Sequence, residues 1–404
     1  MRHGPYARFI TSSWVYTIGF WMQRIGIGWL TWELTHSGAW LGAVAMAYAL
    51  PAILLTPFAG AIADRMDRVR LLSNSQGLQF LTGLVLASFT LAGLSGVFLI
   101  VVIAFILGIL ESIATPARMT IAPNLVPRED LSGAIGLNAV SFNSATFIGP
   151  AIAGATIASI GIGWTFLISA TAFVPHFLVL LRTQLHTDEH MERSSQSLYA
   201  DIIDALSYLI RHRGIAPVLA AAMVGSISVR HLPELMPGFA GDVFALGPEG
   251  LGALMSAFGA GGMLGSFWMA NRNRVQGTTR IFFVGLLGNA IFVFTFAVTD
   301  IFLVGIAAVA LFGFSMSTSG NGSQIMIQTS VRGSLRARAM SLYSLTFRGG
   351  PAIGALVFGG LSTIFGLQAP VMAGASICFI LAVVIMVRHQ STVRTLMEVN
   401  PQRS

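Results

Sequence analysis

The chain has 404 residues, of which 54% are hydrophobic and only 10% are charged. Ordinary soluble domains carry about 25% charged residues, so this chain has too few charges to cover a water-facing surface. The composition excludes a soluble enzyme, a disordered protein and a secreted disulfide scaffold, and it predicts an all-α membrane protein with many spans.

Positive charge in this chain comes from arginine alone. The sequence has 23 basic residues, all of them Arg, against 16 acidic residues, which gives a formal net charge of +7. In a soluble protein this balance would suggest nucleic acid as a partner. In a membrane protein, arginines in short loops set the topology, so we expect the lipid bilayer, and no nucleic acid, as the partner of these charges.

The apolar stretches, taken in chain order, predict twelve transmembrane helices, because each is long enough to cross a bilayer. They cover residues 9–33, 38–62, 72–94, 97–117, 131–160, 163–181, 215–240, 247–270, 280–298, 301–328, 338–364 and 367–387. With a cytoplasmic N-terminus, every Arg outside the spans falls in an inward-facing segment. The positive-inside rule thus predicts a multi-pass protein of the inner (plasma) membrane with both termini in the cytoplasm.

The longest polar stretch divides the chain after the sixth span. We expect a six-helix bundle over 1–182, a cytoplasmic linker over 183–213 and a second six-helix bundle over 214–404. The linker sequence LYADIIDALSYLIRHR places apolar residues on one helical face and predicts a short amphipathic helix. GPAIAG at Gly149–Gly154 and GPAIGA at Gly350–Ala355 indicate two pseudo-symmetric repeats, which places a substrate path at their interface.

The connection between the second and third spans reads GAIADRMDRVRLL over Gly60–Leu72. It resembles the signature loop of the major facilitator superfamily, although Met66-Asp67-Arg68 departs from the usual Gly-Arg-Arg ending. In that family the loop latches the two halves together on the cytoplasmic side. The resemblance therefore implies a gating motif, to which we assign Gly60, Asp64, Arg65, Arg68 and, from the segment TPARM after the fourth span, Arg118.

Three further stretches, beginning at Trp21, Thr115 and Gln328, are similar to the enterobactin-exporter-like and macrolide-efflux-like branch of that superfamily. GPAIAG also resembles the antiporter signature of drug–proton exchangers, with Ala153 in place of a Gly. This resemblance implies that Gly149, Pro150 and Gly154 form a packing and bending element that moves during transport.

Ionisable residues inside spans are costly and therefore indicate function. At about 1.5 Å per residue, Arg24 and Arg230 lie at similar heights, with His231 and Glu234 beside or above Arg230, and we expect both arginines to face the substrate cavity. Glu111 and Arg348 lie nearer the cytoplasm, where an ion pair between them would be reasonable. The alternative for each Arg is a structural role, in which the guanidinium binds backbone carbonyls. The alternative for His231 is also a structural role.

Together these features predict a secondary active transporter that works by alternating access. We expect a monomer that exports a small amphipathic organic molecule, such as a siderophore or a drug, in exchange for protons. Glu111 is the leading proton carrier, with His231 second and with Glu234 and Arg348 in the same coupling or gating group. A metabolite importer of the same fold and a non-transporting scaffold or sensor are the alternatives. The sequence contains no recognisable nucleotide, metal or catalytic motif, so we expect neither an enzyme nor a cofactor.

Overall fold

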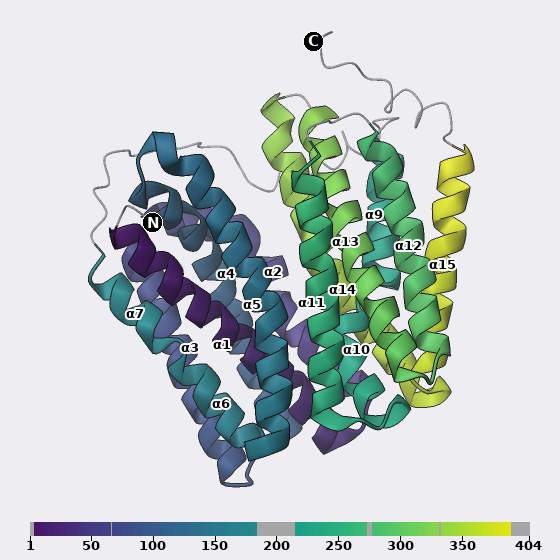
Figure 1. Ribbon diagram of the computed structural model, residues 1–404, viewed down its shortest axis with the longest axis horizontal. Helices are drawn as coiled ribbons and strands as arrows, with labels where there is room; N and C mark the ends of the chain where they lie inside the picture. Colours follow the sequence, from purple (N-terminus) through teal and green to yellow (C-terminus); the bar gives the residue numbers. More distant parts are fainter. Residues whose placement is uncertain (1–3, 66, 184–214, 273–276, 331–332, 389–404) are drawn as a thin grey trace. The chain divides into compact units, whose positions relative to one another are not determined.

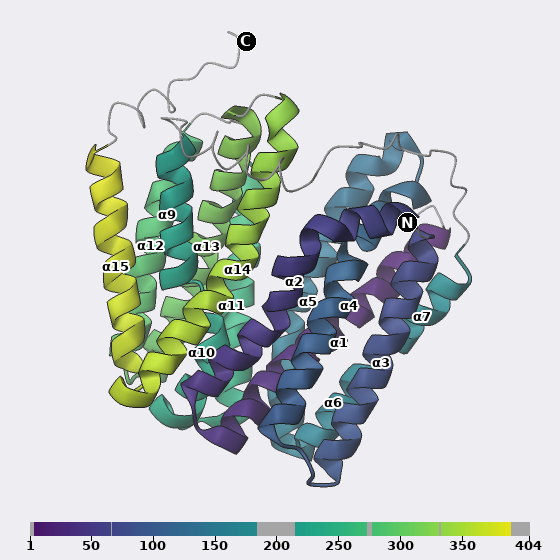
Figure 2. The same ribbon diagram turned by 180° about the vertical axis from the view of Figure 1, so that it is seen from behind.

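The protein is described by a computed structural model that covers the chain except residues 1–3, 66, 184–214, 273–276, 331–332 and 389–404 (Figures 1 and 2). The described residues form helices and short connections, with no strand among them. The predicted amphipathic helix of the linker lies outside these residues.

The first six predicted spans are found as helices, and the sixth is divided into two. The bounds are α1 Gly4–Thr35, α2 Gly38–Arg65, α3 Arg68–Leu91, α4 Val97–Ile121, α5 Leu131–Ile160, α6 Ile162–Thr171 and α7 Val174–Leu181. Two short 3-10 turns, η1 Ala122–Leu125 and η2 Arg128–Asp130, join α4 to α5. The sixth span breaks after Thr171, because Pro175 has no N–H to donate to the carbonyl of that residue.

The last six predicted spans are also helical. Their bounds are α9 Ile215–Ser228, α10 Leu232–Gly238 with the π turn η3 Phe239–Val243, α11 Gly247–Ala270, α12 Thr278–Val298, α13 Phe302–Ser330, α14 Gly333–Phe365 and α15 Gln368–Arg388. The seventh span is interrupted between α9 and α10, and Pro233 at the start of α10 cannot continue the hydrogen-bond ladder. The interruption places Arg230 and His231 outside regular helix.

The chain forms two compact units, which we describe separately. Unit 1 comprises Met1–Arg193 and Met236–Ser256, and unit 2 comprises Ser194–Leu235 and Ala257–Ser404. The segment Met236–Ser256, which includes η3 and the first part of α11, therefore packs with the first six spans. The domain boundaries expected at 182 and 214 stay a prediction.

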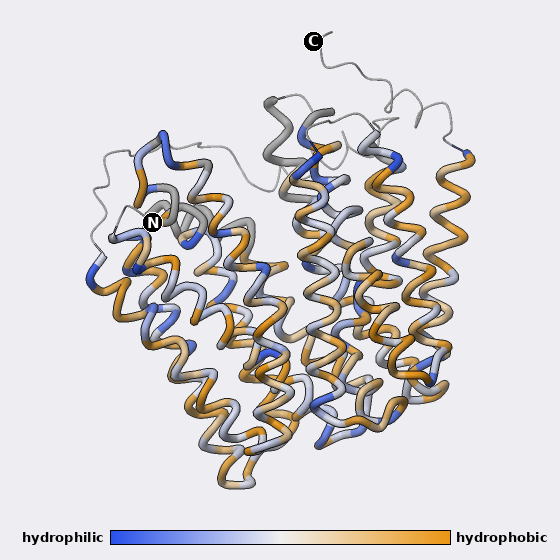
Figure 3. Tube along the Cα trace, viewed as in Figure 1, coloured by the Kyte–Doolittle hydropathy of each residue, from blue (hydrophilic) through white to orange (hydrophobic). Residues whose placement is uncertain are grey.

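Apolar residues run along the helices of both units, and hydrophilic residues gather mostly near the helix ends (Figure 3). Eight helical stretches within the described residues are long and apolar enough to cross a membrane, in α2, α4, α5, α6 with α7, α11, α12, α13 and α15. The other four spans correspond to α1, α3, α9 with α10, and α14. These are also the spans that contain most of the polar residues considered below.

Two apolar clusters form the described core of unit 1. The first cluster lies near the Arg-rich end of the helices and contains Phe9, Val69, Leu71, Leu72, Ala114, Ala117, Ile121 and Leu180. The second cluster contains Ile27, Leu30, Val44, Leu86, Ala87, Ile100, Ile103, Ala104, Leu107 and Phe166. Each cluster draws on α1, α3 and α4 and on the sixth span, so these four elements are held together at two levels.

The two GPAI motifs occupy equivalent places in their repeats. A Cβ at Gly149 would lie 2.6 Å from the Cβ of Trp21, so α5 packs directly against α1 at this glycine. A Cβ at Gly350 would lie 2.6 Å from the Cβ of Ser226, so α14 packs directly against α9 at this glycine. Spans five and one therefore pack as spans eleven and seven do, and the structure confirms the pseudo-symmetric arrangement that the repeated motif predicts.

Candidate functional site

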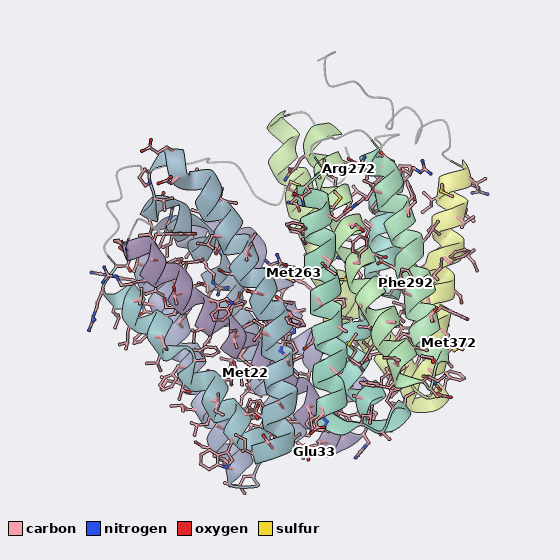
Figure 4. All side chains as sticks on the ribbon, viewed as in Figure 1. Met22, Glu33, Met263, Arg272, Phe292 and Met372 are labelled. Carbon is pink, nitrogen blue, oxygen red and sulfur yellow. The ribbon has the colours of Figure 1, made fainter. Side chains whose placement is uncertain are left out.

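Between the two apolar clusters of unit 1 lies a layer of buried polar side chains. Each contributing element runs from residues of one cluster, through polar residues, to residues of the other cluster. We call this the polar layer and define it by Ser12, Tyr16, Gln76, Gln79, Glu111, Arg118 and His176. Figure 4 shows the side chains of the unit, with Met22 and Glu33 marking the course of α1 beyond the layer.

The charged part of the polar layer is an ion pair within α4. Nη1 of Arg118 donates to Oε1 of Glu111 at 3.2 Å, and Nη2 donates to Oε2 at 3.0 Å. Seven residues make two helical turns, so both side chains leave the same face of α4. The Arg118 side chain is 24% exposed and the Glu111 side chain is 16% exposed. A bidentate ion pair that is buried to this extent is stronger than an ion pair at the surface.

Tyr16 of α1 joins this pair to α3. Its hydroxyl accepts a hydrogen bond from Nη2 of Arg118 at 3.1 Å and donates one to Oε1 of Gln79 at 2.7 Å. The same hydroxyl lies 3.5 Å from Oε2 of Glu111, and the Arg118 guanidinium lies 5.0 Å from the centre of the tyrosine ring. The Tyr16 hydroxyl therefore links α1, α3 and α4, and a change in the charge of Glu111 would alter hydrogen bonds that involve all three helices.

His176 of α7 is buried in the same layer. Its Nδ1 lies 2.9 Å from the hydroxyl oxygen of Ser12, which itself donates to the carbonyl of Phe9 at 3.0 Å. In the tautomer that lets Ser12 keep that second bond, Nδ1 of the neutral ring carries the proton and donates to Ser12. The ring centre lies 5.8 Å from that of Tyr16. The sequence analysis did not consider this histidine, although it lies within the predicted span 163–181.

Several buried polar atoms of the layer have no hydrogen-bond partner among the described residues. They are Nε2 of His176, Nε2 of Gln79, both amide atoms of Gln76 and Nε of Arg118. Gln23 of α1 is also buried, and its Nε2 has no hydrogen-bond partner among the described residues. This atom lies beside Gly83, which is one turn beyond Gln79 on α3. An unsatisfied buried polar group costs about 1–3 kcal/mol, so this concentration indicates a functional part of the molecule.

Unit 2 contains a buried cation of a different kind. The Arg230 guanidinium lies 3.9 Å from the centre of the Phe347 ring, and Nη2 approaches Gly320 of α13. The Tyr343 ring lies against that of Phe347, with ring centres 4.1 Å apart and an angle of 37°, and its hydroxyl donates to the carbonyl of Gly320 at 2.7 Å. Within the described part of the chain, no carboxylate lies within ion-pair distance of this guanidinium.

His231, the neighbour of Arg230, has contacts that hold the interrupted helix in place. Its Nδ1 lies 3.0 Å from the carbonyl oxygen of Ile227, which the broken helix leaves available. The ring stacks on Phe358 with centres 4.5 Å apart and an angle of 7°, and it lies directly against Gly354. These contacts favour the structural role for His231, and its role as a proton carrier stays a prediction.

The structure describes only part of the predicted gating motif. Gly60, Asp64 and Arg65 lie in α2, but their side chains fall outside the described ones. Asp67, the residue that departs from the family pattern, caps α3 by accepting from the N–H of Arg70 at 2.8 Å, and Arg68 begins the helix. The assigned gating roles therefore stay predictions.

The remaining predicted residues lie in both units. The Arg24 guanidinium lies 5.0 Å from the Tyr48 ring centre and 5.9 Å from that of Trp21. Arg348 is exposed on α14, and Glu234 is partly buried in α10. The carboxylate of Glu111 is bound by Arg118, which the sequence analysis had assigned to the gating motif. An ion pair between Glu111 and Arg348 stays a prediction.

The antiporter-like motif makes two close helix contacts within unit 1. Gly149 packs against α1 as described above, and a Cβ at Gly154 would lie 2.8 Å from the Cα of Gly252 in α11. Pro150 lies between them and interrupts the hydrogen-bond ladder of α5. Both glycines are thus required by packing, which is a necessary condition for the predicted moving element but does not test it.

Twelve helical spans in two related repeats, with charged residues buried inside them, define a polytopic membrane transport protein. The family model described as "transmembrane secretion effector" matches residues 1–403, and the chain belongs to this family of the major facilitator superfamily. It is accordingly a transport protein and not an enzyme.

Curated relatives of the chain are transporters at low identity. The staphyloferrin A transporter of Staphylococcus aureus is 26% identical over 92% of this chain and 93% of its own. The multidrug efflux pump Tap of Mycolicibacterium fortuitum is 27% identical over 92% of both chains. The enterobactin exporter EntS of Shigella boydii is 23% identical over 80% of this chain and 76% of its own.

Solved structures share the fold. The nucleoside transporter NupG matches with a TM-score of 0.72 at 14% identity, over 98% of this chain and 100% of its own. A bacterial homologue of the human lysosomal transporter Spinster, inward-facing and unoccupied, matches with a TM-score of 0.67 at 15% identity, over 98% of this chain and 97% of its own. At such identities the likeness extends to the fold alone.

Proposed function

We propose that this protein exports a small amphipathic organic molecule, of the siderophore or drug class, in exchange for protons by alternating access. Export is supported by the names of two relatives, an enterobactin exporter and a multidrug efflux pump. The observation that supports the proposal is the partly buried Glu111–Arg118 pair, because a carboxylate in the membrane-spanning part of a transport protein can serve as a proton carrier.

The pair supplies a mechanism for coupling. Proton binding to Glu111 removes its negative charge and weakens its pair with Arg118, because one carboxyl oxygen then carries the proton and only the other is left as a full acceptor. Arg118 stands at the end of α4 that is predicted to face the cytoplasm, close in sequence to the turns that lead into α5. The protonation state of Glu111 thereby controls the position of an arginine at the proposed cytoplasmic gate.

The substrate side of the proposal relies on Arg230. A guanidinium held on an aromatic face, with no described carboxylate as its partner, suits a carboxylate, catecholate or other anionic group of the substrate. Phe347 and Tyr343 offer ring surface to the apolar part of the same molecule. Such a site favours amphipathic anions over the purely cationic members of the drug class.

The proposal is tested in proteoliposomes that contain the purified protein and an imposed pH gradient. Catecholate siderophores, hydroxycarboxylate siderophores and lipophilic cations are supplied in parallel, and movement is measured in each direction of the gradient. We expect at least one anionic siderophore to be accumulated against its own gradient when protons flow the opposite way. Accumulation in the direction of proton flow would indicate an importer and would refute the proposed direction.

Glu111→Gln provides the internal test of coupling. The glutamine keeps the size and the hydrogen-bonding oxygen but cannot bind a proton at physiological pH. We expect this variant to lose accumulation driven by the pH gradient and to keep exchange of labelled for unlabelled substrate. A variant that still concentrates substrate on a pH gradient would show that Glu111 is a structural residue.

A further inference from the structure

The polar layer lies between two groups of buried apolar side chains. Phe9, Leu72 and Leu180 of the first cluster are nearly or fully buried on one side of it, and Leu86 and Phe166 of the second cluster are fully buried on the other. Along α3, for example, Gln76 and Gln79 lie between Leu72 and Leu86. The layer is thus a polar compartment between two apolar clusters, and it is partly open at Glu111 and Arg118, whose side chains are 16% and 24% exposed.

The unsatisfied atoms of this compartment include both donors and acceptors. Nε2 of Gln79, Nε2 of Gln76 and Nε of Arg118 carry N–H groups, whereas Oε1 of Gln76 and Nε2 of His176 carry lone pairs. For His176 this is the tautomer in which Nδ1 donates to Ser12 and Ser12 keeps its hydrogen bond to Phe9. Only a small ligand that both donates and accepts can satisfy such a set.

Water fits this requirement better than an ion. A metal ion would need several acceptor ligands, and the described residues contain no group of three His, Cys, Asp or Glu side chains that could hold one. An anion would leave the lone pairs of His176 and Gln76 unmet. Buried water molecules typically make about three hydrogen bonds to polar groups that are otherwise unsatisfied.

We propose that the polar layer binds a cluster of water molecules through which Glu111 and His176 exchange a proton. The proposal has two parts, water binding and proton exchange, and the second part rests on the proton-coupled function proposed above. Tyr16 lies beside both residues, with its hydroxyl 3.5 Å from Oε2 of Glu111 and its ring centre 5.8 Å from that of His176. The free glutamine amides line the same region and would orient the waters.

The transfer itself is balanced within the layer. The proton leaves the carboxyl group of Glu111 for an adjacent water, each water passes a proton to the next, and the last one is accepted by the Nε2 lone pair of His176. Glu111 then regains its pair with Arg118, and His176 becomes a cation that still donates to Ser12 through Nδ1. The two apolar clusters lie on either side of this path.

Hydration is tested first on the unmodified protein, by hydroxyl-radical labelling with water radiolysis and mass spectrometry. Radicals formed from bound water oxidise aromatic side chains beside that water, even where bulk solvent has no access. We expect Tyr16, which is 1% exposed, to be labelled well above Phe166, which is 0% exposed within the second apolar cluster. Equal, low labelling of the two residues would show that the layer is dry and would overturn the proposal.

Gln76→Met tests whether the waters depend on the polar lining, because methionine has nearly the same shape without donors or acceptors. We expect labelling of Tyr16 to fall toward that of Phe166 and pH-gradient-driven transport to be lost. Leu254→Met, a substitution of a fully buried α11 residue outside both apolar clusters, is the control and should leave both readouts unchanged. Unchanged Tyr16 labelling in Gln76→Met protein would contradict the assigned water site.

His176→Gln tests the proton acceptor, since an amide can bond to Ser12 but cannot take up a proton. We expect loss of accumulation on a pH gradient with substrate exchange and Tyr16 labelling retained. Full accumulation by this variant would refute the exchange step and leave the water site standing. If the unmodified protein itself shows no pH-driven transport, the proposed function fails, while the labelling of Tyr16 still decides whether the layer is hydrated.

Discussion

Glu111 and Arg118 lie two turns apart on α4 and meet in two hydrogen bonds of 3.2 and 3.0 Å. Because one helix supplies both residues, the pair needs no second helix to bring its members together. Tyr16, from α1, only adds a third group to it. The pair can therefore break and re-form on proton binding while the packing of α4 stays intact.

Removal of one member of this pair should cost more stability than removal of both. Arg118→Met leaves a partly buried carboxylate without its partner, and we expect the free energy of unfolding to fall by about 3 kcal/mol. The double variant Arg118→Met with Glu111→Gln should recover most of that loss. Melting temperatures in detergent micelles measure the difference, and equal melting of the single and double variants would show that the pair is not coupled.

Asp64→Asn should largely abolish transport and leave membrane insertion intact. The prediction rests on the resemblance of Gly60–Leu72 to the signature loop of the superfamily, in which the carboxylate binds across the cytoplasmic side. Transport by proteoliposomes with matched amounts of inserted protein provides the measurement. Asp67→Asn is a useful comparison, because that residue caps α3 and should affect stability more than gating. Normal transport by the Asp64 variant would exclude the gating role.

Arg24 and Arg230 should both be reachable by a water-soluble thiol reagent when replaced by cysteine. The native thiol, Cys378, is fully buried and provides a low background in the same assay. An arginine that faced lipid would cost about 3 kcal/mol even on the more lenient insertion scale, so we expect both side chains to face a watery cavity in at least one state. Protection of both positions in every transport state would favour structural clamps.

Gly149→Ala should be harmful, whereas Gly136→Ala on the same helix should not. A Cβ at Gly149 would lie 2.6 Å from the Cβ of Trp21, and the two helices would have to separate. Overpacking of this kind costs about 1–3 kcal/mol. A Cβ at Gly136 meets nothing within 4 Å, and alanine there should stabilise the helix by about 0.5–1 kcal/mol. Equal melting temperatures for the two variants would show that the close contact carries no packing cost.

The positions of the helices could be predicted from the sequence because each bilayer span must be a long apolar run. The breaks in the sixth and seventh spans, at Pro175 and Pro233, were not predicted, because the hydropathy pattern continues through them. Charge placement identified Glu111 and Arg230 as residues of interest, since an ionisable group stands out in an apolar run. These predictions depend on one helix at a time.

The partners of those residues could not be predicted in the same way. The seven-residue spacing of Glu111 and Arg118 indicates a shared face, yet only side-chain geometry shows that the guanidinium turns back toward the carboxylate. His176, Gln76 and Gln79 are unremarkable within their own helices. They form a layer because α1, α3, α4 and α7 have polar side chains at the same height in the folded unit. The packing of these helices, and not the sequence of any one of them, brings the residues together.

The distribution of hydropathy over the spans has a consequence for how the chain is made. On length and composition, the described parts of α1, α3, α9 with α10, and α14 do not qualify as membrane-crossing stretches, whereas α2, α4, α11 and α15 do. Each weak span is followed directly along the chain by one of these strong ones. During synthesis, each weakly apolar span would therefore enter the membrane together with the strongly apolar span that follows it. The two would insert as a helical hairpin.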